Sequence, residues 1–212
     1  MSAKIPLKQL AYELISEKII NCEYAPNSFL NEQMLSDELN ISRTPIRDAL
    51  IRLQQNNLVQ IFPKKGIVVT EVTPEVISSV YEIRTLIEPY IVRTWGDEID
   101  KEQLSVLKNE IEEGIQSGAN EIHFDDNFHL LITQACPNRY IQDSIRAANI
   151  QNRRIRVIAG ESSERLENSH KQHLEIIDKI LEDKYEDAAI LLSKHLDEAK
   201  LVALDTLIDK WR

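Results

Sequence analysis

Two arginines are the residues best suited to chemistry in the first third of the chain. Ile46, Leu50 and Leu53 recur at helical spacing and predict one apolar helix face. Arg43 and Arg47 are four residues apart, so they share a different face of the same helix. Guanidinium groups bond guanine edges and phosphates in bidentate geometry. This segment therefore suits contact with nucleic acid.

A second group of side chains could bind a metal ion. All five histidines lie beyond residue 120. Asp125 and His129 are four apart and project from one face of an expected helix, while His173 and His195 belong to two later helices. Together they would offer one carboxylate and three imidazoles to a divalent cation, with positions left for water or a ligand. A solvated face or a capped core histidine would give the same Asp-x-x-x-His spacing.

The arginine helix must be positioned by the segment before it. Ser42 can cap its start, and Pro45 falls in the first turn, where a missing N–H is tolerated. Asn31 is a good cap for a preceding helix, and Asn40, which tolerates the left-handed conformation, can end it. This is the spacing of a helix-turn-helix, whose second helix lies in the DNA major groove. Two short amphipathic helices are, however, common in any helical protein.

A basic hairpin after these helices favours the DNA-binding interpretation. Residues 58–62 and 67–72 are β-prone runs, and Lys64, Lys65 and Gly66 lie between them. A hairpin in this place is a wing whose lysines could reach phosphates or the minor groove. The pattern predicts a winged helix-turn-helix.

The segment SRTPIRDAL, with LNEQMLSDEL before it and KKG after it, resembles the winged-helix domain of the GntR family of bacterial transcriptional regulators over residues 6–72. The resemblance implies that Arg43, Thr44 and Arg47 contact DNA and that Gly66 lets the wing approach the minor groove. Family members often carry an arginine where this chain has Gln33, which can still bond a base or a phosphate. The DNA-binding residues expected are Gln33, Arg43, Thr44, Arg47, Lys64, Lys65 and Gly66.

The rest of the chain shows helical periodicity and no strand pattern. Thr73 can cap a new helix with Pro74 at its first position. We therefore expect a DNA-binding domain over residues 1–72 and an all-helical domain over 73–212, for which the family resemblance implies effector binding and dimerisation. The fold class expected is mostly α, with an antiparallel bundle of six helices, or seven if another lies near its start. The helices are expected near 74–95, 100–116, 120–136, 138–159, 163–182 and 185–210.

The bundle resembles the effector (FCD) domain of the FadR-like branch of the GntR family. A metal-binding subset of these domains has a DxxxH segment and two later histidines, to which DDNFHLLITQACPN, HLEIIDKILEDKYEDA and SKHLDEA are similar. The resemblance implies that a divalent cation is held, for which Zn, Ni and Mn are all compatible. Its ligands would be Asp125, His129, His173 and His195.

The sequence says less about the roles of other residues in the bundle. The RTLIE segment is similar to an RxxLE pattern of the family, which makes Arg84 a candidate partner for an effector carboxylate. A structural salt bridge would explain Arg84 equally well. His123 and His170 match no family position and are expected at the surface or in packing.

Charge is divided unevenly along the 212 residues. The chain has 25 Lys+Arg and 35 Asp+Glu, a net charge of −10. Residues 1–72 hold eight of each sign, so all the excess acid lies in residues 73–212. The segment from Arg43 to Lys65 contains five basic residues and only one acidic residue. Positive charge is thus local to the expected DNA face, and the acidic body should weaken nonspecific attachment elsewhere.

Cysteine usage and hydropathy indicate a cytoplasmic protein. Cys22 and Cys136 fall in different expected domains, which favours reduced thiols over a disulfide or catalytic thiol chemistry. Glu13 and Glu17 interrupt the first apolar pattern, unlike a signal peptide. No apolar run approaches the about 20 residues that a membrane helix needs. No membrane partner is expected.

These observations predict a DNA-binding regulator, a repressor that binds operator DNA as a homodimer under control of a small carboxylate effector at the metal. A metal sensor, in which the cation is the signal, is one alternative. A metal-dependent hydrolase is another, although no spare general base accompanies the ligands. A bundle that only dimerises the DNA-binding domain is the third. We do not expect an enzyme.

Overall fold

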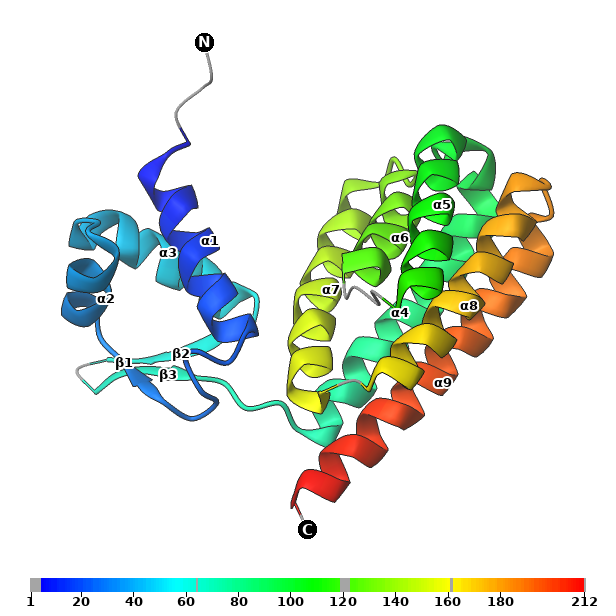
Figure 1. Cartoon of the computed structure of the whole chain (residues 1–212). Coiled ribbons are helices and arrows are strands. Elements are labelled where there is room, and N and C mark those ends of the chain that lie inside the picture. Colours follow the sequence, from blue (N-terminus) through cyan, green and yellow to red (C-terminus); the bar gives the residue numbers. More distant parts are fainter. Residues whose placement is uncertain (1–4, 64, 119–122, 161, 212) are drawn as a thin grey trace. The chain divides into compact units, whose positions relative to one another are not determined.

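The computed structural model describes residues 5–63, 65–118, 123–160 and 162–211 (Figure 1). The chain divides into two compact units, one ending at Thr73 and one beginning at Pro74. Lys64, one of the expected DNA-binding residues, lies outside the described residues.

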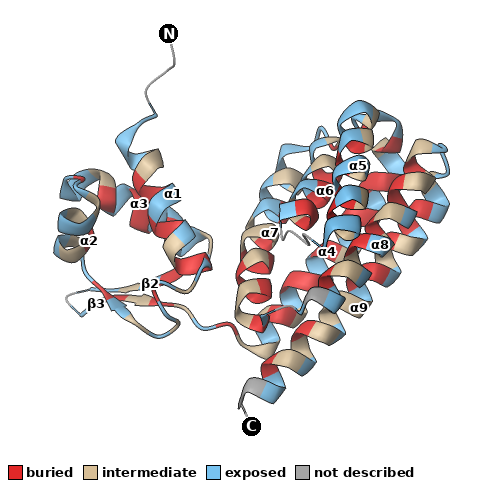
Figure 2. Ribbon diagram, in the orientation of Figure 1, coloured by how far each residue is buried: buried red, intermediate tan, exposed pale blue. Residues whose placement is uncertain are grey.

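The first unit contains three helices and a small sheet. Its elements are α1 (Leu7–Ile20), β1 (Phe29–Leu30), α2 (Glu32–Leu39), α3 (Arg43–Gln55), β2 (Val59–Phe62) and β3 (Gly66–Val69). Both α1 and α2 pack against α3. Ile15, Ile19, Leu35, Ile46 and Leu53 of these helices are fully buried. Figure 2 shows buried segments on α1 and α3. This apolar core fixes α3 with its polar face outward.

The turn between α2 and α3 follows the expected cap chemistry only in part. The Asn31 side chain accepts a hydrogen bond from the backbone N–H of Met34 at 2.8 Å. Asn40 ends α2 in the left-handed conformation, with φ 53°. Ser42 occupies the N-cap of α3, but its side chain makes no capping hydrogen bond, contrary to expectation. The reason is local, since Pro45 stands at the third helical position and has no N–H to donate.

The sheet contains a strand that the sequence did not reveal. Strand order is β1-β3-β2, and both pairs are antiparallel. β1 is only two residues long and pairs with Val68 and Ile67 of β3. Phe62 pairs with Gly66 to close the hairpin, so β3 begins one residue earlier than expected and ends at Val69. Gly66 has a φ of 117°, a backbone conformation that residues with a side chain rarely adopt.

The second unit is all-helical. Its elements are α4 (Pro74–Trp95), the 3-10 helix η1 (Gly96–Glu98), α5 (Lys101–Ser117), α6 (His123–Gln134), α7 (Arg139–Ala159), α8 (Ser163–Leu181) and α9 (Tyr185–Trp211). α4 packs against α9, α7 and α6, and α8 packs against α9, α5 and α6 (Figure 1). None of the described helices is long and apolar enough to cross a membrane. The predicted mostly helical class, winged helix-turn-helix plus helical bundle, is confirmed.

The expected start of α6 at residue 120 lies outside the described residues. Apart from shifts of one residue, the other helix boundaries deviate from expectation at two places. α6 ends at Gln134, two residues early, because a residue preceding proline disfavours helix and Pro137 follows Cys136. η1 was not expected. Pro89 lies buried inside α4, which continues past it although proline cannot donate the hydrogen bond to the carbonyl of Thr85.

Gly96 allows α4 and the start of α9 to approach closely. Gly96 is buried, and a Cβ added to it would overlap the Tyr185 ring. Tyr185 in turn donates from its hydroxyl to Asp183 at 2.5 Å. The ring is therefore held in place and cannot move aside cheaply.

Replacing Gly96 by Ala should destabilise the second unit by about 1–3 kcal/mol through overpacking. Urea denaturation followed by tryptophan fluorescence measures this, because both tryptophans lie beyond Thr73. In a Tyr185→Ala background the same substitution should cost less. An equal cost in both backgrounds would contradict the proposed steric cause.

Candidate functional site

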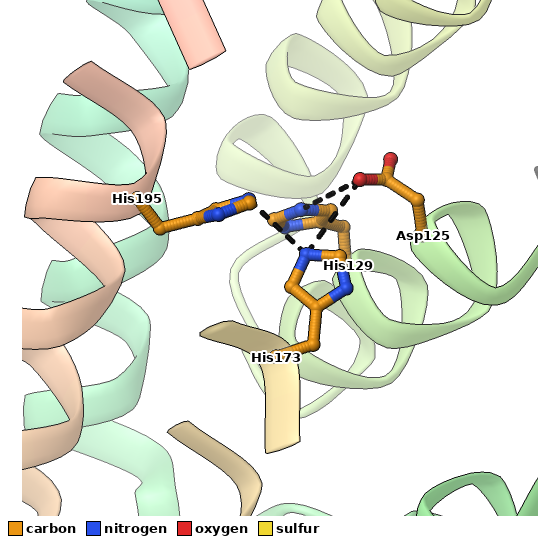
Figure 3. Close-up of side chains that lie close together, drawn as sticks. All are labelled: Asp125, His129, His173 and His195. Atoms are coloured by element: carbon orange, nitrogen blue, oxygen red, sulfur yellow. Dashed lines mark hydrogen bonds and ion pairs between the residues drawn. The ribbon is translucent and has the colours of Figure 1, made fainter. Parts of the chain in front are cut away.

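Four of the predicted site residues converge inside the bundle. Asp125 and His129 come from α6, His173 from α8 and His195 from α9. One ligand atom from each lies within 4.8 Å of all the others, and all four residues are buried. Figure 3 shows the four side chains pointing toward one another. Elements far apart in the sequence thus build one compact set of metal-type donors.

The distances within this cluster suit ligands of one cation. The Nε2 atoms of His173 and His195 are 3.1 Å apart. Asp125 Oδ1 lies 3.7 Å from His129 Nε2 and 3.6 Å from His173 Nε2. Two nitrogens about 2.1 Å from one tetrahedral Zn²⁺ would be roughly 3.4 Å apart. The donor set and its spacing therefore fit a divalent cation.

Two further residues orient the histidines. Glu88 on α4 accepts from His129 Nδ1 at 2.5 Å, and Gln172 on α8 accepts from His195 Nδ1 at 2.7 Å. With Nδ1 protonated in each ring, Nε2 is left as a lone-pair donor facing the cluster. The sequence interpretation missed both residues, although Glu88 ends the quoted RTLIE segment.

The buried surroundings of the cluster favour ionised carboxylates, and they favour neutral imidazoles at His173 and His195. Burial alone would raise the pKa of Glu88, but Arg84 and His129 lower it to about 2. Burial also opposes ionisation of Asp125, yet the Arg156 guanidinium and the histidines hold its pKa below the usual range. Burial lowers the pKa of His195 to about 3, and burial together with His195 lowers that of His173. These are the protonation states that metal ligands require.

Two arginines flank the cluster. Arg84 is 2% exposed and donates through Nε to Glu88 at 2.8 Å. Its Nη2 atom is buried and has no hydrogen-bond partner among the described residues. Arg156, which the sequence did not single out, lies 2.5 Å from the Oδ2 atom of Asp125. Arg84 thus forms a structural ion pair with Glu88, while its Nη2 atom lacks a hydrogen bond within the described part of the chain.

Two cavities adjoin the cluster. The first, about 300 Å³, is walled mainly by α6 and α7, and His129 lines it. The second, about 420 Å³, is walled mainly by α7, α8 and α9, and His195 lines it. Arg84, Asp125 and Asn152 line both. A small molecule in either cavity could touch the metal-type donors.

The expected DNA-binding residues lie at the surface of the first unit. Arg43, Thr44 and Arg47 are exposed near the start of α3. Arg43 donates to the Gln33 side chain, and Arg47 Nε donates to Glu32 at 2.7 Å. The start of α2 therefore holds both arginines.

The wing lies beside one of these arginines, Arg47. A groove of about 520 Å³ is lined by Gln33, Arg47 and Gly66 among others, so it brings α2, α3 and the hairpin to one surface. Lys65 is exposed at the hairpin tip. One face of the unit can thus present a helix and a wing to the same partner.

Comparison with known proteins identifies both units. Residues 7–69 match the model of the bacterial regulatory proteins, gntR family, and residues 79–198 match the model of the FCD domain. The chain is 28% identical over 198 residues to the HTH-type transcriptional repressor RspR of Escherichia coli (strain K12), covering 91% of this chain and 87% of that protein.

One further curated protein and one solved structure are also similar to this chain. The chain is 30% identical over 188 residues to the Nta operon transcriptional regulator of Aminobacter aminovorans, covering 84% of this chain and 88% of that one. The Zn²⁺-bound FCD domain of TM0439 has a similar fold, with a TM-score of 0.55 at 22% identity over 65% of this chain and 97% of that chain.

The curated relatives are transcriptional regulators, which confirms the prediction of a regulator and sets the hydrolase alternative aside. A helix-turn-helix of this kind implies DNA binding. The chain belongs to the GntR family of transcriptional regulators, with an N-terminal GntR helix-turn-helix domain and a C-terminal FCD domain.

Proposed function

We propose that this protein is a repressor whose affinity for operator DNA is controlled by a small organic acid bound at a metal site in the FCD domain. The observation that carries the proposal is the convergence of Asp125, His129, His173 and His195 in a chain with a GntR helix-turn-helix. The repressor RspR, similar along most of the chain, supports repression over activation.

The four residues would hold a divalent cation, for which Zn, Ni and Mn remain compatible. A cation that takes more than four ligands, such as an octahedral one, would keep coordination positions open to a carboxylate. Arg84 Nη2, which has no hydrogen-bond partner within the described part of the chain, would give the same carboxylate a charge-assisted hydrogen bond. Glu88 touches both Arg84 and His129, so ligand contacts and metal contacts share one buried network.

In the first unit, Arg43 and Arg47 would read bases or clamp phosphates, and Thr44 would position the helix. Lys65 and Gly66, with Lys64 in the sequence between the strands, would meet the groove edge. A homodimer would place two such faces on the half-sites of a palindromic operator. The acid must bind the DNA-competent and DNA-free arrangements with different affinity, because equal binding shifts nothing.

A second candidate is that the cation itself is the signal. Four protein donors suffice to complete a tetrahedral zinc site without any acid, which favours this alternative. The two functions separate in one titration. If the cation is the signal, DNA binding follows free metal in the absence of acid; if the acid is the signal, it changes DNA affinity at saturating metal.

Protein purified without chelator or histidine tag should contain about one divalent cation per chain by elemental analysis. His173→Ala should lose it, because the variant removes a buried ligand from the centre of the cluster. His123→Ala, an exposed histidine of the same domain, is the matched control and should keep the cation. Metal-free wild-type protein would contradict the proposed site.

Glu88→Gln should weaken metal affinity about 10- to 100-fold, measured by competition with a chromophoric chelator. The neutral amide makes His129 a poorer donor and leaves Arg84 without its counter-ion. Glu82→Gln changes an exposed residue of the same helix and should leave the affinity unchanged. Equal affinity of both variants would exclude a role for Glu88 in orienting His129.

Arg43→Ala should weaken binding to DNA that the wild-type protein selects from a random duplex library, by about 1–3 kcal/mol, and should relax sequence preference. Arg139→Ala, an 89% exposed residue of α7, serves as control for lost positive charge. Fluorescence anisotropy on selected and scrambled duplexes measures both. A loss of equal size on every duplex would make Arg43 a phosphate clamp rather than a base reader.

A further inference from the structure

We infer that Glu32 of α2 makes Arg47 a reader of base edges rather than a phosphate clamp, and thereby lowers the affinity for DNA of unrelated sequence. Glu32 is a positioning residue in this inference, because it acts on DNA through Arg47. The inference rests on the proposed function, in which Arg47 either reads bases or clamps phosphates. It assigns a role to an acidic residue at a surface where phosphate binding alone would favour basic ones.

The contact between the two side chains leaves the base-reading donors of Arg47 available. Arg47 Nε donates to Glu32 Oε2 at 2.7 Å, and the arginine makes no other hydrogen bond or ion pair within the described part of the chain. Its two Nη groups can therefore donate together to O6 and N7 of one guanine. The Arg47 side chain is 62% exposed, against 32% for that of Glu32, so the arginine is the more accessible partner for DNA.

The same ion pair reduces the net charge that Arg47 presents to DNA. A carboxylate in direct contact largely cancels the field of the guanidinium at a phosphate farther away. Sequence-independent affinity comes from neutralising phosphates with positive charge, whereas base recognition depends on the geometry of hydrogen bonds. Glu32 therefore weakens the attraction of Arg47 to phosphates more than its ability to recognise a base.

The neighbouring arginine on the same helix face has a different partner. Arg43 donates to the side chain of Gln33, which is uncharged. Gln33 in turn donates to Asp37 at 2.6 Å. Among the described residues, a carboxylate thus contacts Arg47 directly but reaches Arg43 only through an amide. Arg43 keeps more of its charge for phosphates, which singles out Arg47 as the arginine whose charge is offset.

Glu32 belongs to the surface that α2, α3 and the hairpin share. It lines the groove of about 520 Å³ together with Arg47 and Gly66, so its carboxylate repels phosphates of any sequence that approach this groove. Glu32 also stands in the first turn of α2, where a negative charge stabilises the helix. A purely structural role of that kind would not change the salt dependence of DNA binding.

Fluorescence anisotropy of full-length variants, on the selected and scrambled duplexes at about 50 to 200 mM salt, tests the inference. Glu32→Gln removes the charge and keeps an acceptor for Arg47 Nε. It should bind scrambled DNA about three- to tenfold more tightly than wild type. Its slope of log affinity against log salt should be steeper by about 0.9, because one more phosphate is neutralised. Glu32→Ala also removes the acceptor, so its preference for the selected duplex should fall about fivefold or more.

Glu23→Gln is the matched control, because it removes the same charge and an ion pair of the same length, 2.7 Å to Lys18. Glu23 does not line the groove, and the variant should bind both duplexes as wild type does. In an Arg47→Ala background, Glu32→Ala should leave the remaining sequence preference unchanged, because the arginine through which Glu32 acts is absent. Thermal melting followed by circular dichroism establishes that each variant is folded.

The outcomes separate this inference from the proposed function. An unchanged salt slope with an equal loss of affinity on both duplexes would make Glu32 a structural residue of α2 and overturn the inference. An equal gain on both duplexes in both Glu32 variants would make Arg47 a phosphate clamp, which also overturns it. If the wild-type protein selects no duplex from the library, operator binding itself fails, and base reading by Arg47 fails with it.

Discussion

The bundle depends on one electrostatic constraint, which is that a charge buried between helices must meet its counter-charge there. Glu88 is fully buried and is bonded to Arg84 on its own helix and to His129 on α6. Asp125 meets Arg156 across α6 and α7. Removing one partner of such a pair leaves an uncompensated charge and costs several kcal/mol. The same pairs that hold these helices in register therefore fix the metal-type donors.

The DNA-binding unit uses polar contacts in a different way, because its arginines lie in solvent. Glu32 holds Arg47, and Gln33, itself bonded to Asp37 at 2.6 Å, accepts from Arg43. Exposed pairs of this kind contribute little to stability. Their effect is to restrict the rotamers of the two arginines before DNA arrives, which lowers the entropy lost on binding.

Local patterns in the sequence were enough to predict the helices of the bundle and the two motif helices. The clustering of Asp125 with three histidines was implied by the resemblance to the FCD domain, because spacing alone also fits a solvated helix face. The features that the sequence did not predict depend on contacts between elements that are distant in the sequence. β1 is a strand only because it pairs with β3. Glu88 has the sequence context of an ordinary helix residue, and only its contact with His129 shows its role. The polar residues of α7, such as Asn152 and Arg156, resemble a solvated face in sequence, yet they are buried against the site.

The proline inside α4 has a mechanical consequence. Pro89 removes one rung of the helix hydrogen-bond ladder next to Glu88, the residue through which α4 contacts the site. The stiffness of α4 is therefore lowest where the site touches it. Bending of α4 at this turn would need less energy than bending a continuous helix, so a change in the buried cluster could be accommodated there without unfolding the helix.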